Sequence, residues 1–123
     1  MSTRVLIVED DLELREAIAD TLELAGFDFL QVGDGEQAVA LLEQEPVDIV
    51  VTDVNMPGMG GIEATKNIRS QQEFRDIPVI GLTAEDTGNC YATLTSAGMN
   101  GILIKPINLE PLLATIREHV ASE

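Results

Sequence analysis

Polar side chains stand directly after four short apolar segments, and their types could hold a metal ion beside a phosphate. The segments and the residues that follow them are 5–8 with Glu9 and Asp10, 48–52 with Asp53, 77–82 with Thr83, and 102–104 with Lys105. Carboxylates brought close together repel one another unless a cation lies among them. Oxygen ligands of this kind, completed by water, are typical of Mg²⁺. A lysine and a hydroxyl beside such a cluster would stabilise a phosphoryl group during its transfer.

The four apolar segments must be arranged so that their ends meet. Each is rich in Val, Ile or Leu, which is typical of strands buried on both faces of a parallel sheet. In an open parallel α/β sheet, the carboxyl ends of the strands form the crevice in which ligands bind. We therefore expect all of these polar residues at one edge of one sheet.

Amphipathic segments alternate with the apolar ones. Apolar residues recur at helical spacing over 11–25, 36–45, 61–70 and 86–97, Asn108 is placed to cap a last helix, and 27–32 is typical of a short second strand. Five strands and five helices joined by right-handed crossovers predict an α/β, flavodoxin-like, doubly wound (βα)5 fold with a five-stranded parallel sheet in the order 2-1-3-4-5. The first and third strands are then neighbours, so Asp10 and Asp53 should converge, with Glu9 beside them.

Length and charge restrict the class of protein. The 123 residues predict one domain, 1–123. The net charge of −15 and the seven scattered basic residues argue against nucleic acid as a ligand of this domain. No apolar stretch reaches the roughly 20 residues that span a bilayer, and we expect neither membrane contact nor a signal peptide. We expect a cytoplasmic protein, because the single cysteine, Cys90, permits no internal disulfide.

Three other kinds of site fit the residues less well. A flavin or dinucleotide site needs a glycine-rich loop after the first strand, whereas the acidic loop 9–11 would repel phosphate. A Ca²⁺ loop of the EF-hand kind needs a glycine at its sixth position, where this loop has Leu14. An aspartate phosphatase usually carries a second acid two residues after its nucleophile, where this chain has Asn55. A site centred on Asp53 is thus suited to accepting a phosphoryl group.

In the order and spacing of these residues, the chain resembles the response-regulator receiver domain of two-component signalling over essentially its whole length. The segments that carry the resemblance are Val-Leu-Ile-Val-Glu-Asp-Asp, Asp-Val-Asn-Met-Pro-Gly, Leu-Thr-Ala and Lys-Pro. The resemblance implies that Asp53 is the phosphoacceptor and that Mg²⁺ is the cofactor. The metal ligands it implies are Asp10 directly, Glu9 through water, Asp53, and the backbone carbonyl of Asn55. It further implies that Thr83 and Lys105 bind oxygens of the phosphoryl group.

The same resemblance implies the partners. A histidine kinase or a histidine phosphotransfer domain would supply the phosphoryl group in a phosphorelay, and a downstream protein or a fused output domain would read the surface of the fourth helix, fifth strand and fifth helix. The domain would catalyse only its own phosphorylation and dephosphorylation, so it would not be an enzyme with a separate substrate. The second half of the chain is similar to receivers of hybrid sensor kinases, whereas the first half is equally similar to those of transcriptional regulators. The alternative is a pseudo-receiver that binds proteins without being phosphorylated.

Two positions depart from the pattern of the family. Ile102 stands where receivers often carry a Tyr or Phe that swings inward, and an isoleucine has no hydroxyl to donate, so we expect a steric repacking in its place. Gly60 stands where an aspartate is frequent. Since that residue is not a ligand, we expect the chemistry to be kept and the loop to be looser. The family also implies a cis peptide bond at Lys105–Pro106.

Overall fold

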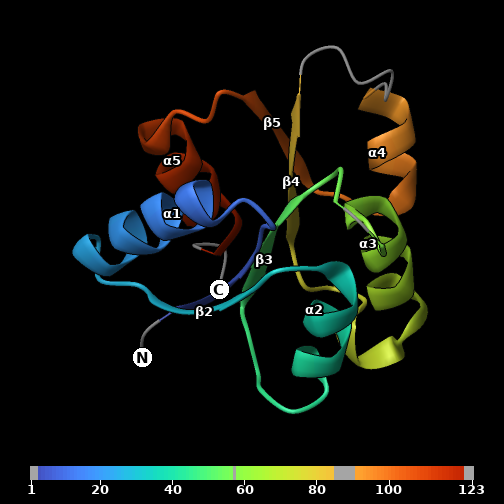
Figure 1. Ribbon diagram of the computed structural model, residues 1–123. Coiled ribbons are helices and arrows are strands. Elements are labelled where there is room, and N and C mark those ends of the chain that lie inside the picture. Colours follow the sequence, from blue (N-terminus) through green and yellow to red (C-terminus); the bar gives the residue numbers. More distant parts are fainter. Residues whose placement is uncertain (1–2, 57, 85–90, 121–123) are drawn as a thin grey trace.

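A five-stranded parallel sheet forms the centre of the molecule (Figure 1). The computed structural model describes residues 3–56, 58–84 and 91–120. The strands are β1 (Arg4–Val8), β2 (Asp28–Val32), β3 (Ile49–Asp53), β4 (Val79–Ala84) and β5 (Gly101–Lys105). They lie in the order β2-β1-β3-β4-β5, which confirms the predicted fold class and sheet order.

Helices cover both faces of the sheet. They are α1 (Leu12–Leu24), α2 (Gly35–Leu42), α3 (Gly61–Ser70), α4 (Tyr91–Ala97) and α5 (Leu109–Val120), with a short 3-10 helix, η1 (Gln72–Phe74), after α3. In Figure 1, α1 and α5 lie on one side of the sheet and α2, α3 and α4 on the other. This alternation is the doubly wound arrangement that the sequence predicts. Within the described residues, no helix combines the length and apolar character needed to cross a membrane.

The first two helices begin at aspartates that cap them, and both aspartates are visible in the sequence. The Asp11 side chain accepts from the Glu13 amide at the start of α1, and the Asp34 side chain accepts from the Gln37 amide at the start of α2. The predicted helix over 36–45 is too long, because α2 ends at Leu42 and the chain turns before Pro46. The η1 turn was not predicted, and residues 86–90 of the predicted helix over 86–97 lie outside the described residues.

The core consists of one apolar cluster on each face of the sheet. The cluster under α1 and α5 includes Ile7, Ile18, Val51 and Ile116, and the cluster under α2, α3 and α4 includes Val8, Val50, Ile68 and Leu94. The strands β1, β3 and β4 are buried on both faces, as predicted. That prediction is wrong for β5, where Ile104 is 56% exposed, because β5 is an edge strand that the helices cover incompletely.

Candidate functional site

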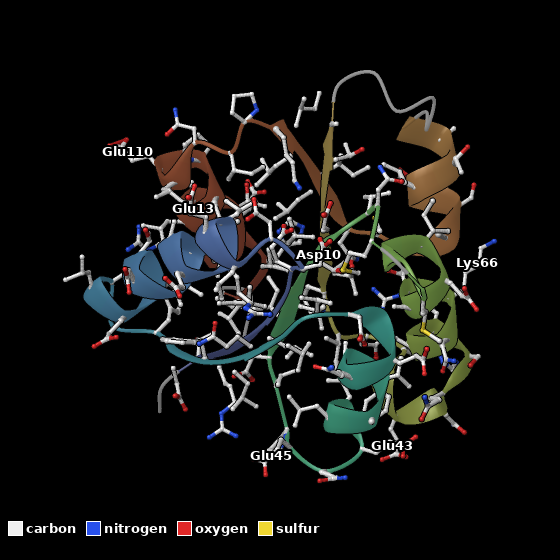
Figure 2. The ribbon with its side chains drawn as sticks, viewed as in Figure 1. Asp10, Glu13, Glu43, Glu45, Lys66 and Glu110 are labelled. Carbon is white, nitrogen blue, oxygen red and sulfur yellow. The ribbon has the colours of Figure 1, made fainter. Side chains whose placement is uncertain are left out.

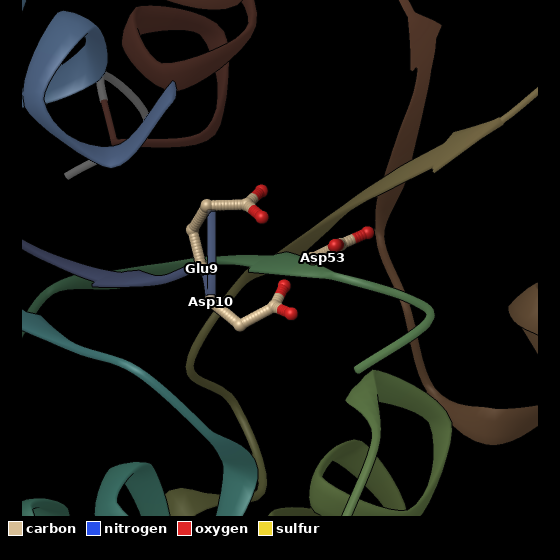
Figure 3. Close-up of side chains that lie close together, drawn as sticks. All are labelled: Glu9, Asp10 and Asp53. Carbon is tan, nitrogen blue, oxygen red and sulfur yellow. The ribbon is translucent and has the colours of Figure 1, made fainter. Parts of the chain in front are cut away.

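Three carboxylates meet at the carboxyl ends of β1 and β3. Glu9 and Asp10 follow β1 directly, and Asp53 is the last residue of β3. The parallel register pairs Val8 with Thr52, so the two strand ends lie side by side. One carboxylate oxygen from each of the three side chains lies within 4.8 Å of the other two. Figure 3 shows Glu9, Asp10 and Asp53 around one small space, as the strand order predicts.

Glu9 is the most deeply buried member of the cluster. Its side chain is fully buried, and Oε2 accepts from the Asp11 amide at 3.1 Å. Its Oε1 is buried without a hydrogen bond among the described residues, because the nearest cation, the Lys105 Nζ, lies 3.6 Å away. Burial raises the pKa of Glu9 to about 7, against the lowering effect of the Asp11 amide, and the charge of Asp53 adds to the rise.

Asp53 forms an ion pair with Lys105. The Lys105 Nζ lies 3.1 Å from Asp53 Oδ2, and the Asn55 amide donates to Oδ1 at 3.4 Å. Burial lowers the pKa of Lys105, but its hydrogen bond to Asp53 and the charges of Asp53 and Glu9 outweigh burial, so that its pKa lies above the ordinary value. Lys105 therefore keeps its positive charge and faces two buried carboxylates from β5.

The loop after Asp53 is held against the end of β3 by backbone contacts. The Gly61 amide donates to the Val54 carbonyl at 2.9 Å, and a Cβ at position 61 would collide with the Asp53 carbonyl oxygen. The side chain of Asn55 is exposed. Gly60 is the residue before α3 and supplies no side-chain cap, yet these backbone contacts hold the loop in place. The sequence did not single out Gly61, although a glycine pair before a helix is the signal that could have identified it.

The Thr83 side chain belongs to the neighbouring strand. Thr83 is buried near the end of β4, and Asp53 pairs with Leu82, the residue before it. Its hydroxyl donates to the Ala84 carbonyl at 3.3 Å. Ile102 pairs with Gly81 across the β4–β5 register and is half-buried in the cluster under α4. The Lys105–Pro106 peptide bond is cis, as the resemblance implies.

The donor set fits a hard cation. Three carboxylates that converge within 4.8 Å would repel one another, and Lys105 alone cannot neutralise them. The buried oxygen Oε1 of Glu9 has no hydrogen bond among the described residues, and its charge is offset only by the Lys105 Nζ at 3.6 Å, which leaves it poorly compensated for a buried carboxylate. Oxygen ligands of this kind suit Mg²⁺. The structure thus brings together Glu9, Asp10, Asp53 and Lys105, with Thr83 on the adjoining strand.

This fold and this arrangement of acids and lysine are those of one family. The model of the response regulator receiver domain matches residues 5–117. The chain therefore belongs to the response regulator receiver domain family, the receivers of two-component signalling.

Relatives with this domain occur both alone and within longer proteins. The chain is 38% identical over 116 residues to the chemotaxis protein CheY-3 of Vibrio cholerae, covering 94% of this chain and 86% of that protein. It is 36% identical over 111 residues to the CAI-1 autoinducer sensor kinase/phosphatase CqsS of the same species, covering 89% of this chain but only 16% of that protein. The match to CqsS thus concerns one domain of a much longer protein.

The fold also matches that of a solved receiver with metal. The receiver domain of the sensor histidine kinase PA1611 from Pseudomonas aeruginosa is 31% identical, with a TM-score of 0.90, and the match covers 99% of this chain and 100% of that chain. That structure contains a magnesium ion coordinated in its active-site cleft.

Proposed function

We propose that the 123 residues are one receiver domain in which Asp53 accepts a phosphoryl group from a phosphohistidine in a Mg²⁺-dependent reaction. The observation that carries this proposal is the buried Asp53 carboxylate, whose oxygen lies 3.1 Å from the Lys105 ammonium and beside the two acids that follow β1. The partner is a histidine kinase or a histidine phosphotransfer domain. The alternative, a pseudo-receiver that binds proteins without being phosphorylated, would not require the three carboxylates and the lysine to lie close together.

Glu9, Asp10 and Asp53 are the side chains that would hold Mg²⁺, with the Asn55 backbone carbonyl as a further ligand. The magnesium ion of the PA1611 receiver domain supports this assignment. When bound, Mg²⁺ would offset negative charge on the phosphoryl oxygens. The buried Oε1 of Glu9, which has no hydrogen bond among the described residues and lies 3.6 Å from the Lys105 Nζ, would then have a second cation nearby.

The chemistry at Asp53 is an in-line displacement. A carboxylate oxygen of Asp53 forms a bond to phosphorus as the bond from phosphorus to the histidine nitrogen breaks, and the electron pair leaves with the imidazole. The Lys105 ammonium, already 3.1 Å from Asp53, pairs with a phosphoryl oxygen and stabilises the charge there. From its position near the end of β4, the Thr83 hydroxyl donates a hydrogen bond to another phosphoryl oxygen. Water later attacks the acyl phosphate, which returns Asp53 to its carboxylate form.

Phosphorylation of Asp53 would change the surface formed by α4, β5 and α5. Once Thr83 turns toward the phosphoryl group, the space between β4, Ile102 and α4 must repack. Ile102 and Leu94 share one apolar cluster, so a shift of Thr83 can reach the surface of α4, β5 and α5 by contact. A downstream protein or a fused output domain reads that surface.

Phosphoryl uptake from a small donor tests the proposed function. Incubation with acetyl phosphate and Mg²⁺ should raise the intact mass by one phosphoryl group, and the gain should be absent when EDTA removes the metal. Asp53→Asn should gain none. A wild-type protein that gains no mass from acetyl phosphate or from a phosphorylated histidine phosphotransfer domain would support the pseudo-receiver instead.

A further inference from the structure

Arg15 is a basic residue beside the site to which the proposed mechanism gives no role. It belongs to the second turn of α1, and its Nη1 donates to the backbone carbonyl of Glu9 at 3.2 Å. A Cβ at position 33 would lie 3.1 Å from the same nitrogen, so Gly33 leaves room for the guanidinium. The Arg15 side chain therefore lies between the end of β1 and the turn between β2 and α2.

The environment of Arg15 is costly for a side chain that only packs. Its Nε is buried without a hydrogen-bond partner among the described residues. A buried donor that lacks a partner destabilises the fold, whereas a methionine would cover the same surface with no unpaired N–H. Packing alone does not explain an arginine here. What methionine could not provide is the hydrogen bond to the Glu9 carbonyl.

The Glu9 carbonyl is part of the peptide group that joins Glu9 to Asp10, so holding it restricts the backbone of both residues. The Glu9 amide donates to the Val32 carbonyl at 3.2 Å, and its side chain accepts from the Asp11 amide at 3.1 Å. With Arg15 on the carbonyl, every backbone polar group of Glu9 has a partner. The direction in which the chain leaves β1, and hence the placement of both acids, is fixed by these contacts.

From this geometry we infer that Arg15 is a positioning residue, which orients Glu9 and Asp10 for Mg²⁺ by holding the Glu9 carbonyl. The inference rests on the proposed function, because it concerns the same metal ligands. A positioning role and a simple charge effect predict opposite changes in Mg²⁺ affinity when Arg15 is replaced. Removing a positive charge near a cation site should tighten Mg²⁺ binding, whereas releasing the acids from their fixed orientation should weaken it.

Arg15→Met tests the inference, because methionine keeps an unbranched stem and removes the guanidinium. Arg75→Met is the matched control: Arg75 is exposed next to η1, before β4, and its loss changes the net charge equally. Mg²⁺ dissociation constants would be measured by calorimetric titration of the full chain. Exchange of the Asp11 amide, which donates to the Glu9 side chain, would be followed in the metal-free protein by NMR.

We expect Arg15→Met to bind Mg²⁺ about tenfold more weakly, the lower end of the range for groups that hold a metal ligand. The Asp11 amide should exchange faster while the core amide of Ile7 keeps its protection, and Arg75→Met should match the wild type in both measurements. Arg15→Lys, which keeps a charged donor, should recover part of the lost affinity. If Arg15→Met does not fold, Arg15→Gln carries the same expectation, because it is uncharged and too short for the contact.

Equal or tighter Mg²⁺ binding by Arg15→Met or Arg15→Gln, or an equal loss in Arg15→Lys, would overturn the positioning role. A wild-type protein that binds no Mg²⁺ and accepts no phosphoryl group would instead refute the proposed function. The two failures are therefore distinct, because only the first leaves the wild type active.

Discussion

Lys105 contacts two buried carboxylates and is the only basic side chain that does so among the described residues. In the unphosphorylated protein it offsets the charge of Asp53, to which it is closer, and only weakly that of Glu9. In the proposed reaction it would exchange this contact for a phosphoryl oxygen. One residue therefore stabilises both the resting site and the transferring group.

Lys105→Met should separate these two effects. The free energy of unfolding should fall by about 1–3 kcal/mol, less than for a fully buried pair, because the Lys105 side chain is 28% exposed. Phosphoryl uptake from acetyl phosphate should slow by about 100-fold or more, since a donor at the developing charge is lost. Urea unfolding and the rate of mass gain measure the two quantities. An unchanged rate in a folded variant would remove Lys105 from the reaction.

The raised pKa of Glu9 predicts a pH dependence of stability. Burial raises this pKa from 4.5 to about 7, so between these values the folded protein holds a proton that the unfolded chain has released. The free energy of unfolding of the metal-free protein should therefore fall as pH rises through this window. Glu9→Gln lacks the titrating group and serves as the reference.

Urea unfolding of both proteins in EDTA, at pH 5 and pH 7.5, measures the effect. The wild type should lose stability relative to Glu9→Gln on going to the higher pH, and Mg²⁺ should reduce the loss. A difference between the two proteins that does not change with pH would show that Glu9 does not titrate in this window.

The sequence predicted which residues meet at the site but not how each is held. The apolar segments identify Glu9, Asp10, Asp53 and Lys105 because strand ends in a parallel sheet coincide. The full burial of Glu9 beside an exposed Asp10 depends on how the neighbouring elements cover the strand end, which no local pattern encodes. The contact of Arg15 with Glu9 was missed for the same reason.

At the level of elements, the loop between β3 and α3 lies against the end of β3 and contributes the Asn55 amide that donates to Asp53 Oδ1. Its closure depends on Gly61, whose Cα faces the Asp53 carbonyl, and on a bond from the Gly35 amide to the Met59 carbonyl at 3.2 Å. The loop is thus braced by α2 as well as by β3.

Gly61→Ala should destabilise the protein by more than about 2 kcal/mol, because its Cβ would overlap the backbone of Asp53 and Val54. Gly60→Ala is the matched control, with ordinary extended backbone and a closest approach of 3.0 Å to the Val54 carbonyl. We expect that control to change stability by less than about 1 kcal/mol, since alanine also restricts the unfolded chain. Denaturant unfolding compares them, and equal losses would contradict the role of Gly61.

The α4 helix is the element best suited to transmit a change at Thr83. It is short, and its buried contacts with the rest of the domain, among its described side chains, are Leu94 and Ala97. Beyond its end, Arg69 of α3 holds the Gly98 carbonyl at 2.9 Å through Nη2. The helix is therefore anchored at its carboxyl end and lightly packed elsewhere.

Beryllofluoride, which imitates an acyl phosphate, should perturb residues 84–106 most and α1 little. Amide shifts or hydrogen exchange with and without the mimic measure this, and the changes should weaken at Gly98, where Arg69 anchors the chain. Asp53→Asn is the control, because the mimic needs the carboxylate. Changes confined to the loops around Asp10 and Asp53 would mean that the α4–β5–α5 surface transmits no signal.

The types of the main elements were predictable from the sequence, but the exposure of individual side chains was not. Apolar runs predicted four of the strands, and the shorter pattern over 27–32 predicted β2. The predicted sheet order already placed β5 at an edge, but the exposure of Ile104 also depends on how completely the helices cover that edge, which no local pattern encodes. The η1 turn follows α3 without a capping signal and was therefore missed.

At the level of the whole molecule, the sheet order creates the site. Adjacent β1 and β3 leave the sheet toward helices on opposite faces, and the acids lie where the connections diverge (Figures 1 and 3). Other acidic residues lie away from this cluster: in Figure 2, Glu13 is on α1, Glu110 on α5, and Glu43 and Glu45 in the segment after α2. Among the described residues, the acidic side chains thus form one convergent cluster at the strand ends, and the others contribute a solvated surface to the net charge of −15.

The modified residue itself is the most direct test of the account. After phosphorylation with acetyl phosphate and Mg²⁺, borohydride reduces an aspartyl phosphate to homoserine, and peptide mass mapping then locates the changed residue. The account predicts homoserine at position 53 in the phosphorylated protein and none in a sample treated without Mg²⁺. A changed residue at Asp10, Asp11 or any other position, with Asp53 intact, would contradict it.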